Sequence, residues 1–339
     1  MRTALLIGGT GNISLPIARK LVAQGWEVSL LNRGNRNDLV PGARFITCDI
    51  HDAKAVEAAL TGRQFDVVAQ FIAYHPEEVA RDIRLFTGKT RQYIFISTAS
   101  AYIKPPRNPV IDEATPRSNP YWQYSRNKIA CEELLKKARD LENFPITIVR
   151  PSHTYGLGAL PLSIHGHKGN WQVIKRVLEK KPVLIPGDGT SLWTVTWSED
   201  FADAFIGLMG NDHAIGESVH ITSDEALTWN QIHRMLAEAL DRPFIPCYVP
   251  SSLLAQAQDY DFTGSLLGDK ANCAVFDNRK IKRLVPGFVA KTRLDQGMRM
   301  SLEHILNNPE KQVEDPDFDR FSDRLVDIMK KAEEQVAAL

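Results

Sequence analysis

The chain has 339 residues, and its 41 lysine and arginine residues balance 41 aspartate and glutamate residues. A formal net charge of zero gives no general basic field, so the composition argues against nucleic acid as a partner. No apolar run approaches the ~20 residues of a membrane-spanning helix, and four scattered cysteines without a CxxC pair favour a cytoplasmic protein with free thiols.

The first stretch, Thr3–Ser14, places an apolar run directly before a glycine-rich turn, and a helical pattern follows at once. This order is typical of a loop that binds a dinucleotide. Gly8 permits the tight turn, and Gly11 lets a pyrophosphate approach the backbone at the start of the helix. We expect three further loop residues to contribute to the cofactor site: Thr10, Asn12 and Ile13. An ordinary strand-to-helix turn is the alternative.

The second predicted strand, Glu27–Leu31, ends at a position that selects the cofactor in dinucleotide-binding folds. An acidic residue there binds the ribose hydroxyls and repels a 2′-phosphate. This chain has Asn32 and Arg33, with Arg36 close by. Because arginine can pair with a phosphate at two points, we predict NADP, with NAD as the alternative. Arg33 can also simply be solvated or stack on adenine.

The next two predicted strands carry further candidates at their ends. Asp49 and Ile50 close a strand that begins at residue 44, where an adenine edge can bind; an equal interpretation makes Asp49 the cap of a helix over 51–60. The buried strand Asp66–Ile72 leads past the expected cofactor. We place Phe71 and Ala73 beside that cofactor, and His75 either against the substrate or in solvent.

The fifth predicted strand, Gln92–Ser97, ends in hydroxyl-bearing residues. Open parallel sheets bind ligands at the carboxyl ends of their strands. Ser97 therefore becomes a candidate for the cofactor and Ser100 for the substrate, and Thr98 is a further candidate ligand contact. Such hydroxyls can also satisfy local backbone groups.

A predicted helix within residues 120–135 carries Tyr124 and Lys128 four positions apart, so both lie on one face. An ammonium near a phenol favours the phenolate and lowers the pKa of the tyrosine. Tyr124 can then exchange a proton with a substrate hydroxyl or carbonyl. An accidental pair on a surface helix is the alternative.

These features together resemble the extended, and in part atypical, short-chain dehydrogenase/reductase superfamily, in its NAD-dependent epimerase/dehydratase family. The matching motifs are the glycine loop, Ser97-Thr98 with Tyr102, Tyr124-xxx-Lys128, and the segment 150–156. The resemblance covers about residues 1–240 well. It departs from the family at Ser14 and Asn32, and Ala99-Ser100 offers no acid for the elimination step of a 4,6-dehydratase.

The resemblance implies a Rossmann-type α/β fold, a doubly wound parallel sheet with a smaller C-terminal α+β substrate domain. It implies catalysis by Thr98, Tyr124 and Lys128, with Pro151 and His153 near the nicotinamide, and a homodimer. We divide the chain into a dinucleotide-binding domain, a substrate-binding part and a helical tail. Their bounds are 1–155 with part of 190–225, then 156–190 with 226–310, then 311–339.

The region after the sixth predicted strand is expected to cover the substrate. His165 and His167 can contact a sugar or phosphate there, or can belong to a solvated loop. No partner ligands stand at zinc spacing, so we predict no metal. We expect a loop over 261–269, Thr228 as a helix cap, and a basic cluster over 277–283 that is either a phosphate contact or a solvated helix face.

The resulting prediction is an NAD(P)-dependent epimerase or dehydrogenase/reductase. It acts by hydride transfer on a secondary alcohol or ketone of a sugar or nucleotide-sugar-like small molecule. The alternative is a catalytically silent relative that senses a dinucleotide or binds RNA, because the chain also resembles chloroplast stem-loop RNA-binding members of the superfamily.

Overall fold

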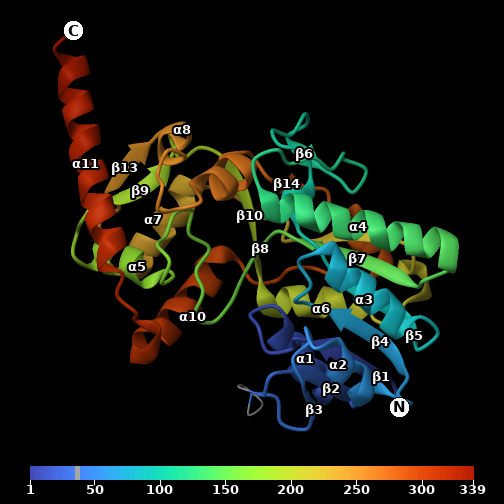
Figure 1. Cartoon of the computed structure of the whole chain (residues 1–339). Helices are drawn as coiled ribbons and strands as arrows, with labels where there is room; N and C mark the ends of the chain where they lie inside the picture. Colours follow the sequence, from blue (N-terminus) through green and yellow to red (C-terminus); the bar gives the residue numbers. More distant parts are fainter. Residues whose placement is uncertain (35–38) are drawn as a thin grey trace.

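Within residues 1–34 and 39–339, which this computed structural model describes, seven parallel strands form one sheet in the order β11-β7-β5-β4-β1-β2-β3 (Figure 1). Their bounds are β1 (Thr3–Ile7), β2 (Glu27–Asn32), β3 (Arg44–Thr47), β4 (Phe65–Gln70), β5 (Thr90–Ile96), β7 (Ile146–Pro151) and β11 (Ser218–Ile221). The strand order reverses between β1 and β4. Such a reversal leaves a crevice at the carboxyl ends of the strands, where doubly wound folds bind nucleotides.

Helices cover both faces of this sheet, because its central strands are buried on both sides. One face packs against α1 (Ser14–Ala23), α6 (Ser198–Leu208) and α9 (Arg279–Leu284). The opposite face packs against α2 (Ala53–Leu60), α3 (Pro76–Phe86) and α4 (Gln123–Glu142). The predicted Rossmann-type doubly wound sheet is therefore confirmed.

A third core holds the remaining segments together. Its small sheets pair β8 (His153–Tyr155) with β10 (Leu192–Trp197) and β12 (Ala226–Thr228), β9 (Val183–Pro186) with β13 (Pro246–Val249), and β6 (Val110–Ile111) with β14 (Val275–Phe276). Its helices are α5 (Trp171–Leu178), α7 (Trp229–Ala239), α8 (Ser251–Leu254), α10 (Leu294–Asn307) and α11 (Pro316–Ala337). The end of α11 projects beyond the rest of the chain in Figure 1.

Three local predictions have clear outcomes. The expected cap Thr228 is confirmed, because its hydroxyl accepts the amide of Gln231 at 3.1 Å. The interpretation of Asp49 as the cap of α2 is wrong, because Asp52 accepts the amide of Ala55 instead. The loop expected over 261–269 is also wrong, because residues Thr263–Lys270 form a π-helical segment.

Candidate functional site

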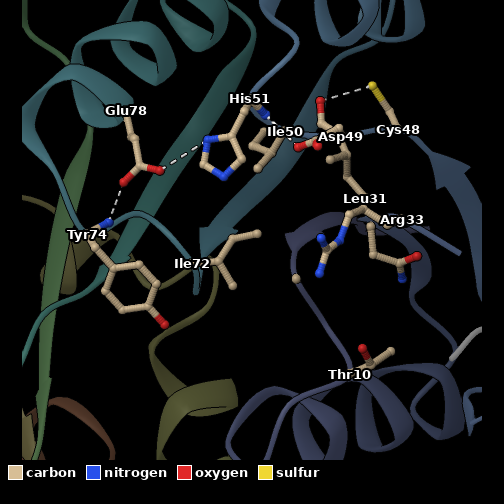
Figure 2. A pocket seen from close by; sticks show the side chains of 12 residues that line it. Thr10, Leu31, Arg33, Cys48, Asp49, Ile50, His51, Ile72, Tyr74 and Glu78 are labelled. Atoms are coloured by element: carbon tan, nitrogen blue, oxygen red, sulfur yellow. Dashed lines mark hydrogen bonds and ion pairs between the residues drawn. The ribbon is translucent and has the colours of Figure 1, made fainter. Parts of the chain in front are cut away.

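A cavity of about 390 Å³ opens at the carboxyl ends of β1, β2 and β4, where the strand order reverses. Figure 2 shows Thr10, Arg33 and Asp49 around one side of it and Ile72 and Tyr74 on the other. Gly8, Asn32 and Ile50 also line it, in agreement with the sequence-based expectation that these residues meet in space. Phe71 lies elsewhere, since its ring packs against Phe205.

The glycine loop forms one end of this cavity. Gly8 has a φ of +107°, and a Cβ there would lie 3.1 Å from Ile72 Cγ2, so a side chain would be strained and would crowd the cavity wall. The Gly11 amide donates to Ser14 Oγ at 3.0 Å, whereas the amides of Asn12 and Ile13 donate to no described residue. Ser14 therefore stands in for the family's third glycine and also holds the turn.

At the end of β2, two polar side chains have donor groups without a partner among the described residues. The buried Nδ2 of Asn32 has no partner, and the Arg33 guanidinium makes no hydrogen bond or ion pair with the residues that the structure describes. Arg36 lies outside the described residues. A cavity that carries an open glycine turn, an orphaned amide and an unpaired guanidinium has the donors that a phosphorylated dinucleotide requires.

Tyr124 and Lys128 lie near the carboxyl ends of β4 and β5, as the shared helix face predicts. Lys128 is buried, and its Nζ donates to the carbonyls of Ala73 and Ile96, each at 2.7 Å. The same Nζ lies 4.6 Å from the ring centroid of Tyr74 and 6.0 Å from that of Tyr124. The Tyr124 phenol and the Thr98 hydroxyl line one cavity, and Thr98 is close enough to lower the pKa of that phenol. The three predicted catalytic residues are thus neighbours.

Burial is the largest cause of the pKa shifts of Tyr124 and Lys128. It raises the pKa of Tyr124 to about 12, an effect that the nearby Thr98 hydroxyl only partly opposes. It lowers the pKa of Lys128 to about 8. The prediction that Lys128 lowers the pKa of Tyr124 is therefore wrong. Desolvation of the buried phenol raises this pKa by more than its neighbours lower it.

A second cavity, of about 250 Å³, opens beside Tyr124. Among its lining residues, those predicted from the sequence are Thr98, Ser100, Tyr124, Pro151 and His153. Burial lowers the pKa of His153 to about 3, so its imidazole is neutral. The other lining residues include five large or charged side chains that the sequence analysis above does not place in the site: Lys104, Trp122, Trp193, Asp269 and Phe276. Trp122 stands next to the predicted Tyr124 helix, whereas the other four come from distant parts of the sequence and gave no local signal.

The predicted histidine contacts are used within the fold. His75 begins α3 and faces the side chain of Asn127 at 3.1 Å. The Nδ1 of His165 lies 2.9 Å from the Gly166 carbonyl, and His167 stacks on Tyr260 at 4.8 Å. None of the three lines either cavity described above.

Two other predicted cofactor contacts also serve the framework. Ser97 Oγ donates to Glu132 Oε1 at 2.6 Å, and the Ala73 carbonyl accepts from Lys128. In the part of the chain that the structure describes, no three acidic, histidine or cysteine side chains are grouped to hold a metal ion. No described helix is both long enough and apolar enough to cross a membrane.

Comparison with known proteins identifies relatives of this chain. A reductase named 2'-dehydrokanamycin reductase, from Streptomyces kanamyceticus, is 27% identical over 84% of this chain and 79% of its own length. The chloroplast stem-loop binding protein of 41 kDa b from Arabidopsis thaliana is 28% identical, over 69% of this chain and 62% of that protein.

Solved structures show the same fold at lower identity. The epimerase Mth375 from Methanothermobacter thermautotrophicus superposes with a TM-score of 0.74 at 18% identity, covering 91% of this chain and 93% of that chain. UDP-glucuronic acid 4-epimerase from Bacillus cereus, solved with UDP-glucuronic acid and NAD, gives 0.73 at 20% identity, covering 90% and 99%. The profile of the NAD dependent epimerase/dehydratase family matches residues 4–221. This chain therefore belongs to the NAD-dependent epimerase/dehydratase family.

Proposed function

We propose that the chain is an NADP-preferring oxidoreductase that interconverts a ketone and a secondary alcohol on a sugar-like ring. One observation carries the proposal: the hydroxyls of Thr98 and Tyr124 line one cavity, with the Lys128 ammonium buried close by. The bound nicotinamide cofactor supplies or accepts the hydride. The protein residues bind the reacting oxygen and move its proton.

In the reductive direction, Tyr124 donates its phenolic proton to the ketone oxygen as that oxygen gains charge. A pKa of about 12 keeps this phenol protonated at neutral pH, which suits a proton donor. Thr98 holds the same oxygen by a hydrogen bond. Lys128 uses two of its three donors on strand carbonyls, so one remains for a ribose hydroxyl.

The preference for NADP rests on the end of β2. Arg33 lines the cofactor cavity without a partner among the described residues, and no acid occupies the position of Asn32. A guanidinium stabilises a 2′-phosphate, whereas an acid would repel it. NAD remains the alternative, and it suits an epimerase that keeps its cofactor and returns the hydride to the other face of the ketone.

A direct experiment is to denature the purified protein and identify any released nucleotide. We expect an empty protein that then binds NADPH more tightly than NADH. Retained NAD⁺ would instead favour epimerisation. A protein that binds neither nucleotide would favour the silent or RNA-binding alternative, which one relative's name suggests.

Substitution of Tyr124 by phenylalanine then tests the proton donor. Loss of a general acid costs about 10²–10⁴-fold in rate, so Tyr124→Phe should abolish most NADPH-dependent reduction of a panel of keto sugars while NADPH affinity is retained. Tyr121→Phe is the matched control, because Tyr121 lies three residues earlier and its side chain is exposed. Unchanged turnover in Tyr124→Phe would overturn the proposal.

A further inference from the structure

The cavity beside Tyr124 is small for the ligands that a nucleotide-sugar enzyme accepts. Its volume is about 250 Å³, whereas drug-sized ligands occupy ~300–1,000 Å³. Under the proposed function, the same space also admits the nicotinamide ring next to Pro151 and His153. The room that remains fits one six-membered ring rather than a nucleoside diphosphate joined to a sugar.

The charged residues of this cavity also argue against a sugar joined to a nucleoside diphosphate. Of the described residues that line it, Lys104 and Asp269 are the two with a formal charge, and they pair at 3.5 Å. Their side chains are 2% and 18% exposed, respectively. Because this pair is internally balanced, the cavity has no spare cation for a doubly charged diphosphate, and burying such an anion without a partner is costly.

The basic cluster over 277–283 does not supply the missing charge. Arg279 pairs with Asp277, which precedes it by two residues. Lys280 and Lys282 each pair at 2.7 Å with acids of other segments, Glu217 and Asp224. None of these cations lines the cavity beside Tyr124. The interpretation of the cluster as a phosphate contact is therefore not supported, and the solvated helix face accounts for it.

The π-helical segment Thr263–Lys270 fixes the Lys104–Asp269 pair near the reacting groups. Asn119 Nδ2 donates to the Ser100 carbonyl at 2.8 Å and to the Gly268 carbonyl at 2.7 Å, which ties this segment to the turn after Thr98. The negative charge of Asp269 is close enough to raise the pKa of Tyr124, although burial is the larger cause. A carboxylate and an ammonium thus face the same space as the phenol.

An aromatic wall completes this arrangement. The ring of Trp122 lies 5.0 Å from that of Tyr124 between their centroids. Trp122 is held there by close packing, because a Cβ on Gly264 would lie 2.2 Å from Trp122 Cδ1. Aromatic rings bind the apolar face of a sugar, while carboxylates accept and ammonium groups donate hydrogen bonds to its hydroxyls.

We propose that the ring bound beside Tyr124 is an unphosphorylated sugar or cyclitol unit, with hydroxyls held by Asp269 and Lys104, and that sugars linked to a nucleoside diphosphate are excluded. This inference rests on the proposed function for the choice of reacting group. It narrows the substrate class from sugars in general to rings without a nucleotide.

Saturation-transfer NMR on the full chain with NADPH tests the proposal directly. The probes are a set of methyl hexosides, inositols and UDP-glucose. We expect saturation transfer to at least one free ring, with a Kd at least tenfold lower than that of UDP-glucose. Equal or tighter binding of UDP-glucose, or transfer to none of the free rings, would overturn the proposal.

Two variants identify the groups that bind the ring. Asp269→Asn removes the carboxylate and leaves Lys104 unpaired, so affinity for the free ring should fall about tenfold and affinity for UDP-glucose should rise. Lys104→Met should also weaken binding of the free ring. Asp259→Asn is the control, because Asp259 is an exposed acid outside the cavity wall. Unchanged ring affinity in both cavity variants would overturn the assignment.

The experiments distinguish a failure of the substrate-class proposal from a failure of the proposed function. Tight binding and turnover of UDP-glucose would refute the substrate class while hydride transfer stands. Binding of a free ring without any NADPH-dependent conversion would refute the proposed function while the ring site stands.

Discussion

Glu132 and Arg150 form a buried ion pair behind the candidate site. The carboxylate of Glu132 accepts from Arg150 Nε at 2.8 Å and from Arg150 Nη2 at 2.7 Å, and both side chains are at most 1% exposed. Glu132 lies one helical turn after Lys128 on α4, and it also accepts from Ser97. The pair therefore fastens the helix that carries Tyr124 to the ends of β5 and β7.

Removing one partner of the Glu132–Arg150 ion pair should strongly lower the free energy of unfolding. We expect Glu132→Ala to lower the free energy of unfolding by about 3–5 kcal/mol, because Arg150 would remain buried without a counter-charge. Urea denaturation measures this change. The double substitution Glu132→Leu with Arg150→Met should cost less than Glu132→Ala alone, since the buried Arg150 charge is removed and Arg117, which also pairs with Glu132, keeps Glu133 as a partner. A single-variant loss below about 1 kcal/mol would contradict this account.

The pH dependence of reduction should follow Lys128 rather than Tyr124. Tyr124 must be protonated to donate, and with a pKa of about 12 it stays protonated through neutral and mildly alkaline pH. Lys128, with a pKa lowered to about 8, loses its charge as the pH rises through that value. We therefore expect kcat/KM to be flat below about pH 7 and to fall above about pH 8.

The variant Lys128→Met supplies the comparison for this profile. It should be slower at every pH and should lack the alkaline decline near pH 8, because no ammonium remains to titrate. A decline of unchanged position in Lys128→Met would assign it to another group.

Cofactor preference should depend on Arg33. Charge-assisted hydrogen bonds contribute about 1.5–3 kcal/mol, but Arg33 is exposed, so solvent screens its charge. We therefore expect Arg33→Ala to weaken NADPH binding by about tenfold. NADH, which lacks the 2′-phosphate, should be unaffected. Asn32→Asp should favour NADH further, since the new carboxylate repels the phosphate. Fluorescence titration of both nucleotides measures this; an equal loss for both would contradict the prediction.

Close packing at Gly264 should couple stability to the substrate cavity. A methyl group at this position meets Trp122, so Gly264→Ala should cost about 1–3 kcal/mol of stability and reduce turnover by displacing the indole. Ser265→Ala is the adjacent control, because the Ser265 hydroxyl donates to the Asp261 carbonyl at 2.9 Å at the solvent-accessible side of the segment, and it should change stability by less than about 0.5 kcal/mol. Thermal unfolding and turnover are measured on both variants.

The sequence predicted the sheet well because its signal is local. Apolar runs such as Thr3–Ile7 and Phe65–Gln70 end in glycine or polar residues, and the strand ends that bear Thr10, Asn32 and Thr98 follow from them. The glycine loop and the Tyr124/Lys128 spacing likewise need only neighbouring residues. These features locate the proposed cofactor cavity and the proposed reacting groups.

The cavity beside Tyr124 could not be predicted in the same way. Lys104, Trp193 and Asp269 reach it from a loop, a short strand and a π-helical segment, and only tertiary packing brings them together. The histidines that looked available in sequence instead bond to nearby backbone or stack on Tyr260.

The position of β11 in the sheet has a consequence for the order in which the protein is made. Ser218–Ile221 pairs with β7, yet more than 60 residues, which include strands of the third core and helix α6, separate the two strands in the chain. During synthesis, the edge of β7 therefore stays open until that intervening chain has left the ribosome. An open strand edge recruits other chains, so a nascent polypeptide arrested after β7 has emerged from the ribosome, but before β11 has emerged, should aggregate.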